Sequence, residues 1–309
     1  CSVSIEVEIT EPEAITISET HSDYTGYGVS CNGESDGWID VTVAGGDGDY
    51  SYAWIGLGGT YISVSEDISG LSEGIYILIV TDERNCVNSI EVEITETDVM
   101  AISETHSDYT GYGASCNGES DGWIDVIVTG GTGAYTYSWS NGETSEDLSD
   151  LSAGTYSVIV SDENGCSVSI EVEITETDVM TISESHSDYM SYGVLCNGAS
   201  DGWIDVTVTG GAGVYTYAWV NGSAGSFVSE FTQETISNLP AGIYSVVVTD
   251  ENACSVSIEV EITEPHEIAI FIDSVTSGPH FESDITEGFG AIETTVTSCN
   301  ENEIYEYEF

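Results

Sequence analysis

The chain has 309 residues, of which 56 are acidic and one, Arg84, is basic, so its formal net charge is −55. A chain without clusters of Lys and Arg cannot hold nucleic-acid phosphates, and anionic lipid would repel it. Its 40% hydrophobic content is nevertheless sufficient for folded cores, and we expect the acidic surface to keep a long polymer soluble. No apolar run approaches the roughly 18 residues of a membrane-spanning helix, so direct membrane insertion is not expected.

One unit occurs three times in tandem. It runs between two cysteines, at residues 31–86, 116–166 and 196–254, and the sequence SIEVEIT follows each copy. Each unit is large enough for a small core of its own, unlike the repeats of a solenoid. We therefore divide the chain into 1–12, the last strand of a preceding repeat; 13–97, repeat 1; 98–177, repeat 2; 178–265, repeat 3; and 266–309, the start of a diverged fourth repeat.

The predicted elements follow the same order in every copy. Residues 1–10, CSVSIEVEIT, match residues 166–175, and their alternation of apolar and acidic residues predicts a half-buried strand with an acidic outer face. Residues 14–19 form the next predicted strand. An irregular extended segment, HSDYTGYGVSC at 21–31, then leads to the first cysteine. We call this segment and its counterparts at 106–116 and 186–196 the lead-in segments.

The second half of the unit continues with short strands. We expect strands at 38–43, with Ile39 and Val41 on one face, and at 50–54. The pattern Leu-x-x-Gly-x-Tyr precedes a further strand at 76–81 and is typical of a tyrosine corner. A last strand follows an acidic turn, which reads DERN in repeat 1 and DENG in repeat 2.

No segment has a helical period. Short strands separated by Gly and Asp turns predict an all-β chain of tandem immunoglobulin-like or PKD-like antiparallel β-sandwich repeats. Only a few residues connect one repeat to the next, so neighbouring repeats should be closely coupled. We expect them to form an elongated rod.

All six tryptophans occupy two positions of the unit. Trp54, Trp139 and Trp219 lie in the strand where an immunoglobulin-like core often keeps a Trp, so we expect them to be buried. The other set is Trp38, Trp123 and Trp203, and Trp38 shares a strand face with Asp40. Packing in a core or between domains is the simpler interpretation of this second set, and a ligand-stacking platform is the alternative.

Repeated cysteines indicate disulfides and an oxidising compartment, and their spacing lacks the CxxC pairs typical of zinc sites. They are Cys1, Cys31, Cys86, Cys116, Cys166, Cys196, Cys254 and Cys299. Pairing within each unit would join 31–86, 116–166 and 196–254. An immunoglobulin-like topology favours Cys31–Cys166 and Cys116–Cys254 instead, because about eight residues at ~3.3 Å each separate the two ends of a sandwich. Cys1, Cys86, Cys196 and Cys299 would then pair with repeats beyond this chain. Both schemes stay open here.

Acidic turns are the candidate metal ligands. They are Asp36, Asp121 and Asp201, each ahead of Gly-Trp, and Asp82, Asp162 and Asp250 in the turn before the last strand. Turns of the Asx type explain both groups without an ion, whereas a Ca²⁺ site needs six to eight converging oxygens. Ca²⁺ is therefore the one candidate cofactor.

Nothing in the sequence has the pattern of a catalytic centre. His21, His106 and His186 recur in the motif HSDY, but no Ser-His-Asp or Cys-His constellation is legible. A base in each of three tandem copies would be unusual for catalysis, so we expect a structural turn. The chain is not expected to be an enzyme.

The combined pattern CNGxSDGWID…GG…YxYxW…NG…L…AGxY…VxDENGC…IEVEITE resembles the SprB repeat of Bacteroidetes surface proteins, from Cys1 to about Pro265. The resemblance implies an extracellular filament of a very large cell-surface adhesin, exported by type IX secretion and serving attachment or gliding motility. Its partners would be neighbouring repeats, other filament strands, and a surface polysaccharide or the substratum. It supplies no catalytic residue. The alternatives are a multivalent Ca²⁺-dependent carbohydrate-binding array and the stalk of a secreted hydrolase.

Overall fold

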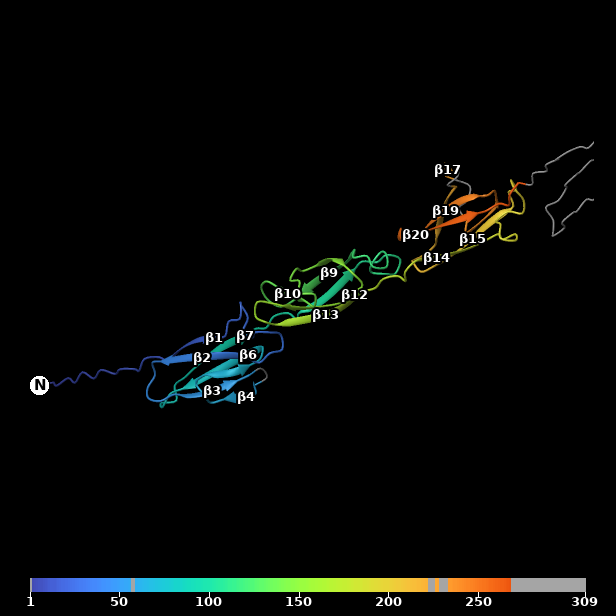
Figure 1. Cartoon of the computed structure of the whole chain (residues 1–309). Helices are drawn as coiled ribbons and strands as arrows, with labels where there is room; N and C mark the ends of the chain where they lie inside the picture. The colour runs from blue at the N-terminus through green and yellow to red at the C-terminus, as the bar shows by residue number, and fades with distance from the viewer. Residues whose placement is uncertain (1, 57–58, 222–225, 228–232, 268–309) are drawn as a thin grey trace, which may run out of the picture. The chain divides into compact units, whose positions relative to one another are not determined.

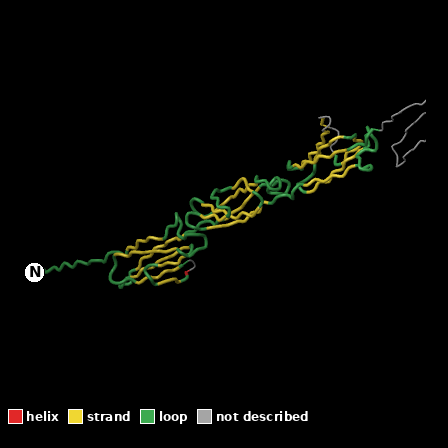
Figure 2. Tube along the Cα trace, viewed as in Figure 1, coloured by secondary structure: helices red, strands yellow, loops and turns green. Residues whose placement is uncertain are grey.

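The computed structural model describes residues 2–56, 59–221, 226–227 and 233–267. These residues contain β-strands and no α-helix, and every strand pairing is antiparallel, which confirms the all-β prediction (Figures 1 and 2). Accordingly, the described part of the chain has no helix that could cross a bilayer.

The chain divides into two compact units. One contains Cys1–Ala114 with Gly118–Glu176, and the other contains Ser115–Asn117 with Thr177–Phe309. Repeats 1 and 2 thus fall in the first unit and repeat 3 in the second. The rod-like arrangement stays a prediction.

Repeat 1 is a sandwich of two sheets. The strand order of the first sheet is β1-β2-β5, with β1 at Thr16–His21, β2 at Gly37–Ala44 and β5 at Ile68–Leu71. The order of the second is β4-β3-β6-β7, with β4 at Tyr61–Ser63, β3 at Ser51–Ile55, β6 at Gly74–Thr81 and β7 at Val87–Ile94.

Repeats 2 and 3 have the same topology, except that the second sheet of repeat 2, described in full, has three strands and no counterpart of β4. In repeat 2 the sheets are β8-β9-β11 and β10-β12-β13, with β8 at Ala101–His106, β9 at Gly122–Thr129, β10 at Thr136–Trp139, β11 at Leu148–Leu151, β12 at Gly154–Ser161 and β13 at Ser167–Ile174. In repeat 3 they are β14-β15-β18 and β17-β16-β19-β20, with β14 at Thr181–His186, β15 at Gly202–Thr209, β16 at Thr216–Asn221, β17 at Ser226–Phe227, β18 at Thr235–Leu239, β19 at Gly242–Thr249 and β20 at Ser255–Ile262.

Alternation of side chains explains each core. Ile39 and Val41 point inward from β2, as predicted, and meet Leu78 and Val80 of β6 around the fully buried Trp54. The Trp54 indole N–H donates to the carbonyls of Ser65 and Glu66, both at 3.1 Å, so the large ring is buried without an unsatisfied donor. The predicted burial of Trp54, Trp139 and Trp219 is confirmed.

The predicted tyrosine corner is also confirmed. The Tyr76 hydroxyl donates to the Ser72 carbonyl at 3.0 Å, and Tyr156 and Tyr244 make the same bond four residues back. These bonds fix the chain where it enters β6, β12 and β19. The last strands, β7, β13 and β20, pair with these strands and therefore lie at equivalent positions in the three repeats.

Residues 2–10 differ from expectation. They match β13 in sequence but have no strand partner among the described residues, and Val3, Ile5, Val7 and Ile9 are exposed. A strand cannot be assigned without a ladder of hydrogen bonds to a neighbour. The predicted fourth repeat, apart from residues 266–267, lies outside the described residues.

Candidate functional site: the junction between repeats

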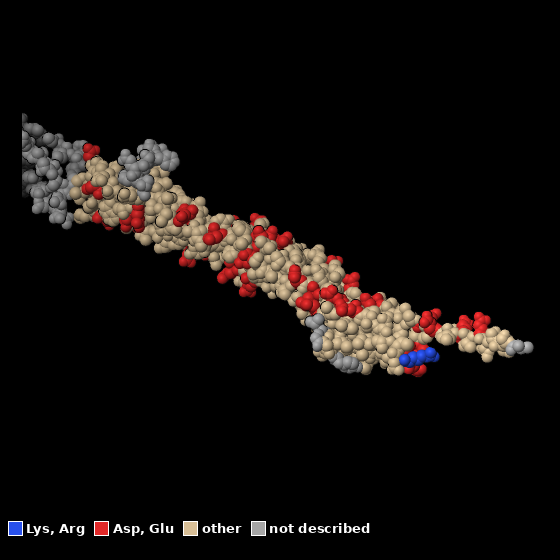
Figure 3. Space-filling view, turned by 180° about the vertical axis from the view of Figure 1, so that it is seen from behind, with Lys and Arg blue, Asp and Glu red and all other residues tan. Residues whose placement is uncertain are grey.

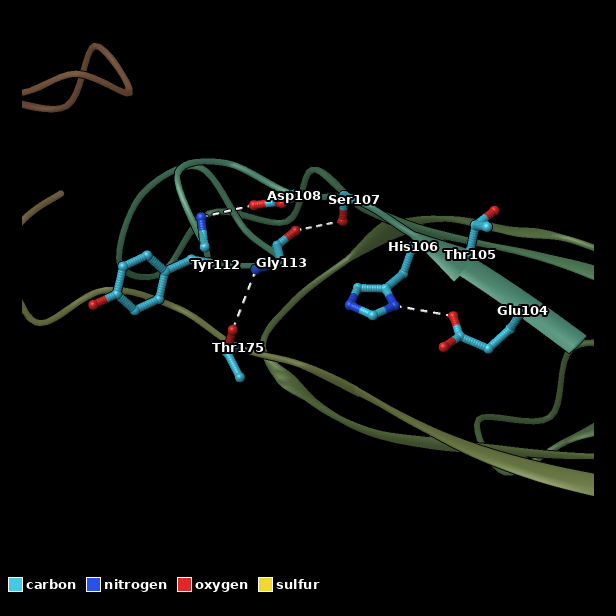
Figure 4. A pocket seen from close by; sticks show the side chains of 9 residues that line it. Glu104, Thr105, His106, Ser107, Asp108, Tyr112, Gly113 and Thr175 are labelled. Carbon is cyan, nitrogen blue, oxygen red and sulfur yellow. Dashed lines mark hydrogen bonds and ion pairs between the residues drawn. The ribbon is translucent and has the colours of Figure 1, made fainter. Parts of the chain in front are cut away.

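Each lead-in segment folds into a compact loop. In repeat 2 (Figure 4) the Ser107 hydroxyl donates to the Gly113 carbonyl at 2.5 Å and accepts the Trp123 N–H at 3.1 Å. The Asp108 carboxylate accepts the Gly111 N–H at 2.7 Å. Ser22 and Ser187 make the same bonds in the other repeats. The motif HSDY is thus a structural turn, as predicted.

The loop is fixed to the end of the last strand of its own repeat. Gly113 N donates to Thr175 Oγ1 at 3.3 Å, and Ala114 N donates to the Thr175 carbonyl at 2.9 Å. A Cβ on Gly113 would lie 2.9 Å from Ile174 Cγ2, so only glycine permits this close approach. The loop therefore carries the following cysteine to a defined position.

That cysteine bonds to the next repeat. Cys31 of repeat 1 is linked to Cys166 of repeat 2, with a Cα–Cα distance of 5.6 Å and a sequence separation of 135. Cys116 and Cys254 form the equivalent bond within the second unit, with a Cα–Cα distance of 5.7 Å. Of the two pairing schemes that the sequence left open, the structure contains the one that crosses from repeat to repeat.

Hydrogen bonds from Asn164 hold the turn beside this disulfide against the lead-in segment of repeat 1. Asn164 Nδ2 donates to the carbonyls of Tyr24 and Ser30, both at 3.2 Å, and Thr25 Oγ1 donates to Asn164 Oδ1 at 2.8 Å. In the second unit, Asn252 Nδ2 donates to the Ser115 carbonyl at 3.0 Å. The sequence analysis did not predict that Asn164 and Asn252 contact a lead-in segment. The recurrence of both the HSDY motif and the acidic turn in every repeat was a usable signal for this contact.

The side chain of Asn164 offers a direct test of this contact. Asn164→Asp replaces the donor with a carboxylate oxygen that faces two carbonyls, so we expect the Cys31–Cys166 bond to become about tenfold easier to reduce, corresponding to ~1.4 kcal/mol. Equilibration with glutathione followed by peptide mapping measures this. Cys116–Cys254 is the internal control and should not change. Equal shifts of both bonds, or none, would contradict the role of Asn164.

Buried aspartates hold the turn that carries the second cysteine. Asp162 Oδ1 accepts the N–H groups of Asn164 and Cys166 at 3.0 and 2.8 Å, and its Oδ2 accepts that of Thr132 at 2.9 Å. Asp82 and Asp250 do the same in their repeats. Hydrogen bonding from the backbone, above all from Cys86, holds the pKa of the Asp82 carboxyl below its ordinary value.

These carboxylates were candidate calcium ligands. Their oxygens accept backbone N–H groups, as do one oxygen of Asp36, from Ser30, and one of Asp201, from Leu195. The described residues contain no group of three or more His, Cys, Asp or Glu side chains placed to hold a metal ion. Asp121 lies at the equivalent position of repeat 2, where the Tyr109 hydroxyl donates to its backbone carbonyl at 3.3 Å.

We therefore expect calcium to have little effect on the folded repeats. Thermal unfolding of the oxidised chain should show the same Tm in EDTA and in millimolar Ca²⁺, to within about 1 °C, because backbone amides already bond both carboxylate oxygens of Asp82, Asp162 and Asp250. Scanning calorimetry in matched ionic strength is the measurement, with Mg²⁺ as the control. A rise of several degrees in Ca²⁺ alone would show a structural calcium site.

A shallow pocket adjoins the lead-in loops of repeats 1 and 2. In repeat 2 it has a volume of about 380 Å³, and Glu104, His106, Tyr112 and Thr175 are among its lining residues (Figure 4). His106 Nδ1 lies 2.9 Å from Glu104 Oε2, and the same pair recurs as His21–Glu19 and His186–Glu184. Ser107 is buried and donates its hydroxyl to a carbonyl, so it is not placed as a nucleophile for His106.

The second set of tryptophans, defined in the sequence analysis, lies on the surface. Trp38, Trp123 and Trp203 are 40, 41 and 37% exposed, so their interpretation as core residues is wrong. The cause is the strand alternation itself, because burying Ile39 turns Trp38 to the outer face together with Asp40. Thr20 of β1 pairs with Asp40, so hydroxyl and carboxylate groups lie beside the indole.

The remaining cysteines have different states. Cys86 is an exposed free thiol, and Cys196 is disulfide-bonded. The predictions for Cys1 and Cys299 lie outside the described residues. Cys86 occupies the same place in its turn as Cys166 and Cys254, so its expected pairing with another repeat stays a prediction.

Comparison with protein families identifies the unit. The family model of the SprB repeat matches residues 29–59, 114–144 and 194–224. The chain contains three SprB repeats. Each match begins at the end of a lead-in segment and covers the first cysteine, the exposed Trp and the buried Trp of one SprB repeat.

Solved structures with a related arrangement of strands include adhesins and immunoglobulin-like proteins. One is a Ca²⁺-stabilised adhesin with which an Antarctic bacterium binds ice (16% identity, 83% of this chain and 75% of that chain, TM-score 0.36). Another is a tetra-tandem repeat from the extending region of a large adhesion protein (14%, 82% and 74%, TM-score 0.27). A third is Dpr2 Ig1-Ig2 in complex with DIP-Theta Ig1-Ig3 (13%, 82% and 99%, TM-score 0.29). These likenesses carry no argument about the function of the SprB repeats here. A search among curated proteins found no match.

Proposed function

We propose that this chain is a length-giving segment of a surface adhesin, in which SprB repeats act mechanically. The observation that carries the proposal is the disulfide that joins the lead-in segment of repeat 1, and likewise that of repeat 2, to the second cysteine of the following repeat. A covalent bond in that place resists the separation of neighbouring repeats under load. The presence of three SprB repeats supports the same reading.

The surface fits a crowded extracellular filament. Figure 3 shows Asp and Glu side chains spread over the face in view, beside the one basic residue of the chain. Like charge of this density opposes the collapse of filaments on one another. An oxidising compartment outside the cytoplasm, where the disulfides persist, is part of the proposal. More specifically, we propose that the protein is exported by type IX secretion and serves gliding motility.

Localisation and attachment together test the proposal. Antibodies against residues 13–265 should label intact cells, and deletion of whole repeats from the parent gene should reduce attachment and shorten the surface filaments seen by electron microscopy. Deletion of one repeat is the graded control and should shorten the filaments by a constant step. Labelling that requires cell lysis, or attachment that is indifferent to the number of repeats, would refute the proposal.

Exposure of Trp38, Trp123 and Trp203 favours a second candidate, a multivalent carbohydrate-binding array. An indole beside hydroxyl and carboxylate groups suits stacking on a neutral sugar ring, and three weak sites in tandem would add avidity. Affinity electrophoresis in neutral polysaccharide gels tests it, with the triple Trp→Ala variant at these positions as the control. Equal retardation of the two chains would exclude this candidate. The stalk of a secreted hydrolase is a further form of the mechanical role, with the chemistry outside these residues.

A further inference from the structure

Asparagine followed by glycine is a chemically labile pair, and the described residues contain it at 32–33, 117–118, 141–142, 164–165 and 197–198. The backbone nitrogen of the glycine can attack the side-chain Cγ of the asparagine, because no Cβ on the glycine obstructs the approach. The reaction is slow where the structure holds the carboxamide in place. The partners of each carboxamide therefore decide which pair can react.

The pairs that directly follow the lead-in segments are held by their own repeats. Asn32 Nδ2 donates to the Thr97 carbonyl at 2.7 Å, and Gly33 N donates to Glu96 Oε2 at 2.8 Å. All four residues belong to repeat 1. The equivalent pairs of repeats 2 and 3 make the same two bonds within their own repeats. Separation of neighbouring repeats would leave these pairs protected.

The pair at 164–165 differs, because another repeat holds its carboxamide. Asn164 Nδ2 donates to the carbonyls of Tyr24 and Ser30, both at 3.2 Å. Its Oδ1 accepts the Thr25 hydroxyl at 2.8 Å. All three partners lie in the lead-in segment of repeat 1, so the carboxamide of Asn164 is fixed by the docking of repeat 1 on repeat 2.

We propose that Asn164 is a modification site, which is protected while repeats 1 and 2 are docked and is deamidated after they separate. Gly165 N loses its proton and bonds to Asn164 Cγ as the Cγ–Nδ2 bond breaks, and Nδ2 leaves as ammonia. Water then opens the cyclic imide at either carbonyl, which gives aspartate or isoaspartate at position 164. The net reaction consumes one water and releases one ammonia, with no oxidant or reductant.

Docking opposes the first step of this reaction. Closure of the imide ring turns the carboxamide of Asn164 out of its plane and expels Nδ2, so the three hydrogen bonds to repeat 1 must break first. Loss of these bonds should make the undocked pair react more than about tenfold faster than the docked pair. The Cys31–Cys166 disulfide joins the same two segments and keeps the docked state populated.

The modification would change the junction permanently. Isoaspartate adds a backbone methylene to the turn in which Asp162 Oδ1 accepts the N–H groups of Asn164 and Cys166, at 3.0 and 2.8 Å. The turn could then no longer present Cys166 to the lead-in segment as before. In repeat 3 the equivalent residue, Asn252, precedes Ala253, whose Cβ slows the attack. The two junctions should therefore differ in their lability.

The test compares the oxidised chain with a chain whose junction is opened by substitution. Cys31→Ser removes the disulfide, and Thr25→Asp in the same chain places a carboxylate against Asn164 Oδ1. Reaction of the Cys166 thiol with maleimide reports that the junction is open. Both chains are incubated in mildly alkaline buffer, and peptide mapping of isoaspartate gives the rate at each asparagine. The rate at Asn164 should rise more than about tenfold in the opened chain.

Matched sites within the chain make the result decisive. Asn141, exposed in a turn of repeat 2, should react at the same rate in both chains, and Asn117 should stay protected in both, which shows that repeat 2 is folded. Gly165→Ala in the opened chain should slow the reaction several-fold. Its Cβ meets open space, and Ala253 takes the same place in repeat 3.

The proposal is wrong if the Asn164 rate is the same in the oxidised chain and in an opened chain whose Cys166 is reactive. It is also wrong if Gly165→Ala leaves the rate in the opened chain unchanged. Neither result bears on adhesion, which is tested separately.

Discussion

When the oxidised chain is held under tension, reduction of its disulfides is expected to increase its contour length by a large and measurable amount. Cys31 and Cys166 are 135 residues apart in sequence, and their bond removes the residues between them from the path of a pulling force. At roughly 3.3–3.6 Å per extended residue, breaking the bond should free about 450–490 Å of contour length. The effect exceeds anything that loss of one sandwich core could produce in the oxidised chain.

Single-molecule force spectroscopy with handles at residues 13 and 177 measures this length before and after a reductant is added. Cys31→Ser should give the reduced behaviour without any reductant. The matched control is Cys86→Ser, which removes a thiol that bridges nothing in the structure and should leave the oxidised trace unchanged. Full extension of the oxidised chain between the handles would show that the bond does not carry load.

Trp139→Ala is expected to destabilise repeat 2 by about 3–5 kcal/mol. The indole is 3% exposed, packs in the core of the repeat, and donates its N–H to the Ser145 carbonyl at 2.9 Å. The substitution leaves both a cavity and an unpaired carbonyl. Urea unfolding followed by tryptophan-independent circular dichroism measures the free energy.

Trp123→Ala in the same repeat is the control. Its side chain lies on the outer face of β9 and is 41% exposed, so the loss should stay below about 1 kcal/mol. Comparable losses for both variants would mean that the outer tryptophan is also part of a packed interface. That result would remove the main support for a sugar-stacking role.

Local rules predicted most of the sandwich. Alternation placed Ile39 and Val41 inward, and the pattern ahead of Tyr76 gave the corner that the Ser72 carbonyl completes. The short strands β4 and β5 were missed. Only Ile68 and Leu71 of β5 are buried, and a bulge interrupts its pairing with β2, so no alternation was available to detect it.

The junction was less accessible to sequence reasoning. Thr25 and Asn164 are 139 residues apart, and such contacts have no period in the sequence. The cysteine pairing depended on which ends of two sandwiches meet. Both pairing schemes therefore remained open until the structure showed the disulfides. Trp38 and its counterparts were expected to pack in a core or between domains, although Trp38 shares a strand face with Asp40, whereas the alternation that buries Ile39 places Trp38 on the outer face.

The two disulfides overlap along the chain, since Cys116 precedes Cys166 in sequence while each is bonded elsewhere. One peptide bond broken at any point between Cys31 and Cys254 would therefore leave both fragments joined by at least one sulfur bridge. In the proposed extracellular role, where proteases are present, this interleaving would keep a chain that has been cut once in one piece. Three cuts would be needed to sever it, one between Cys31 and Cys116, one between Cys116 and Cys166, and one between Cys166 and Cys254.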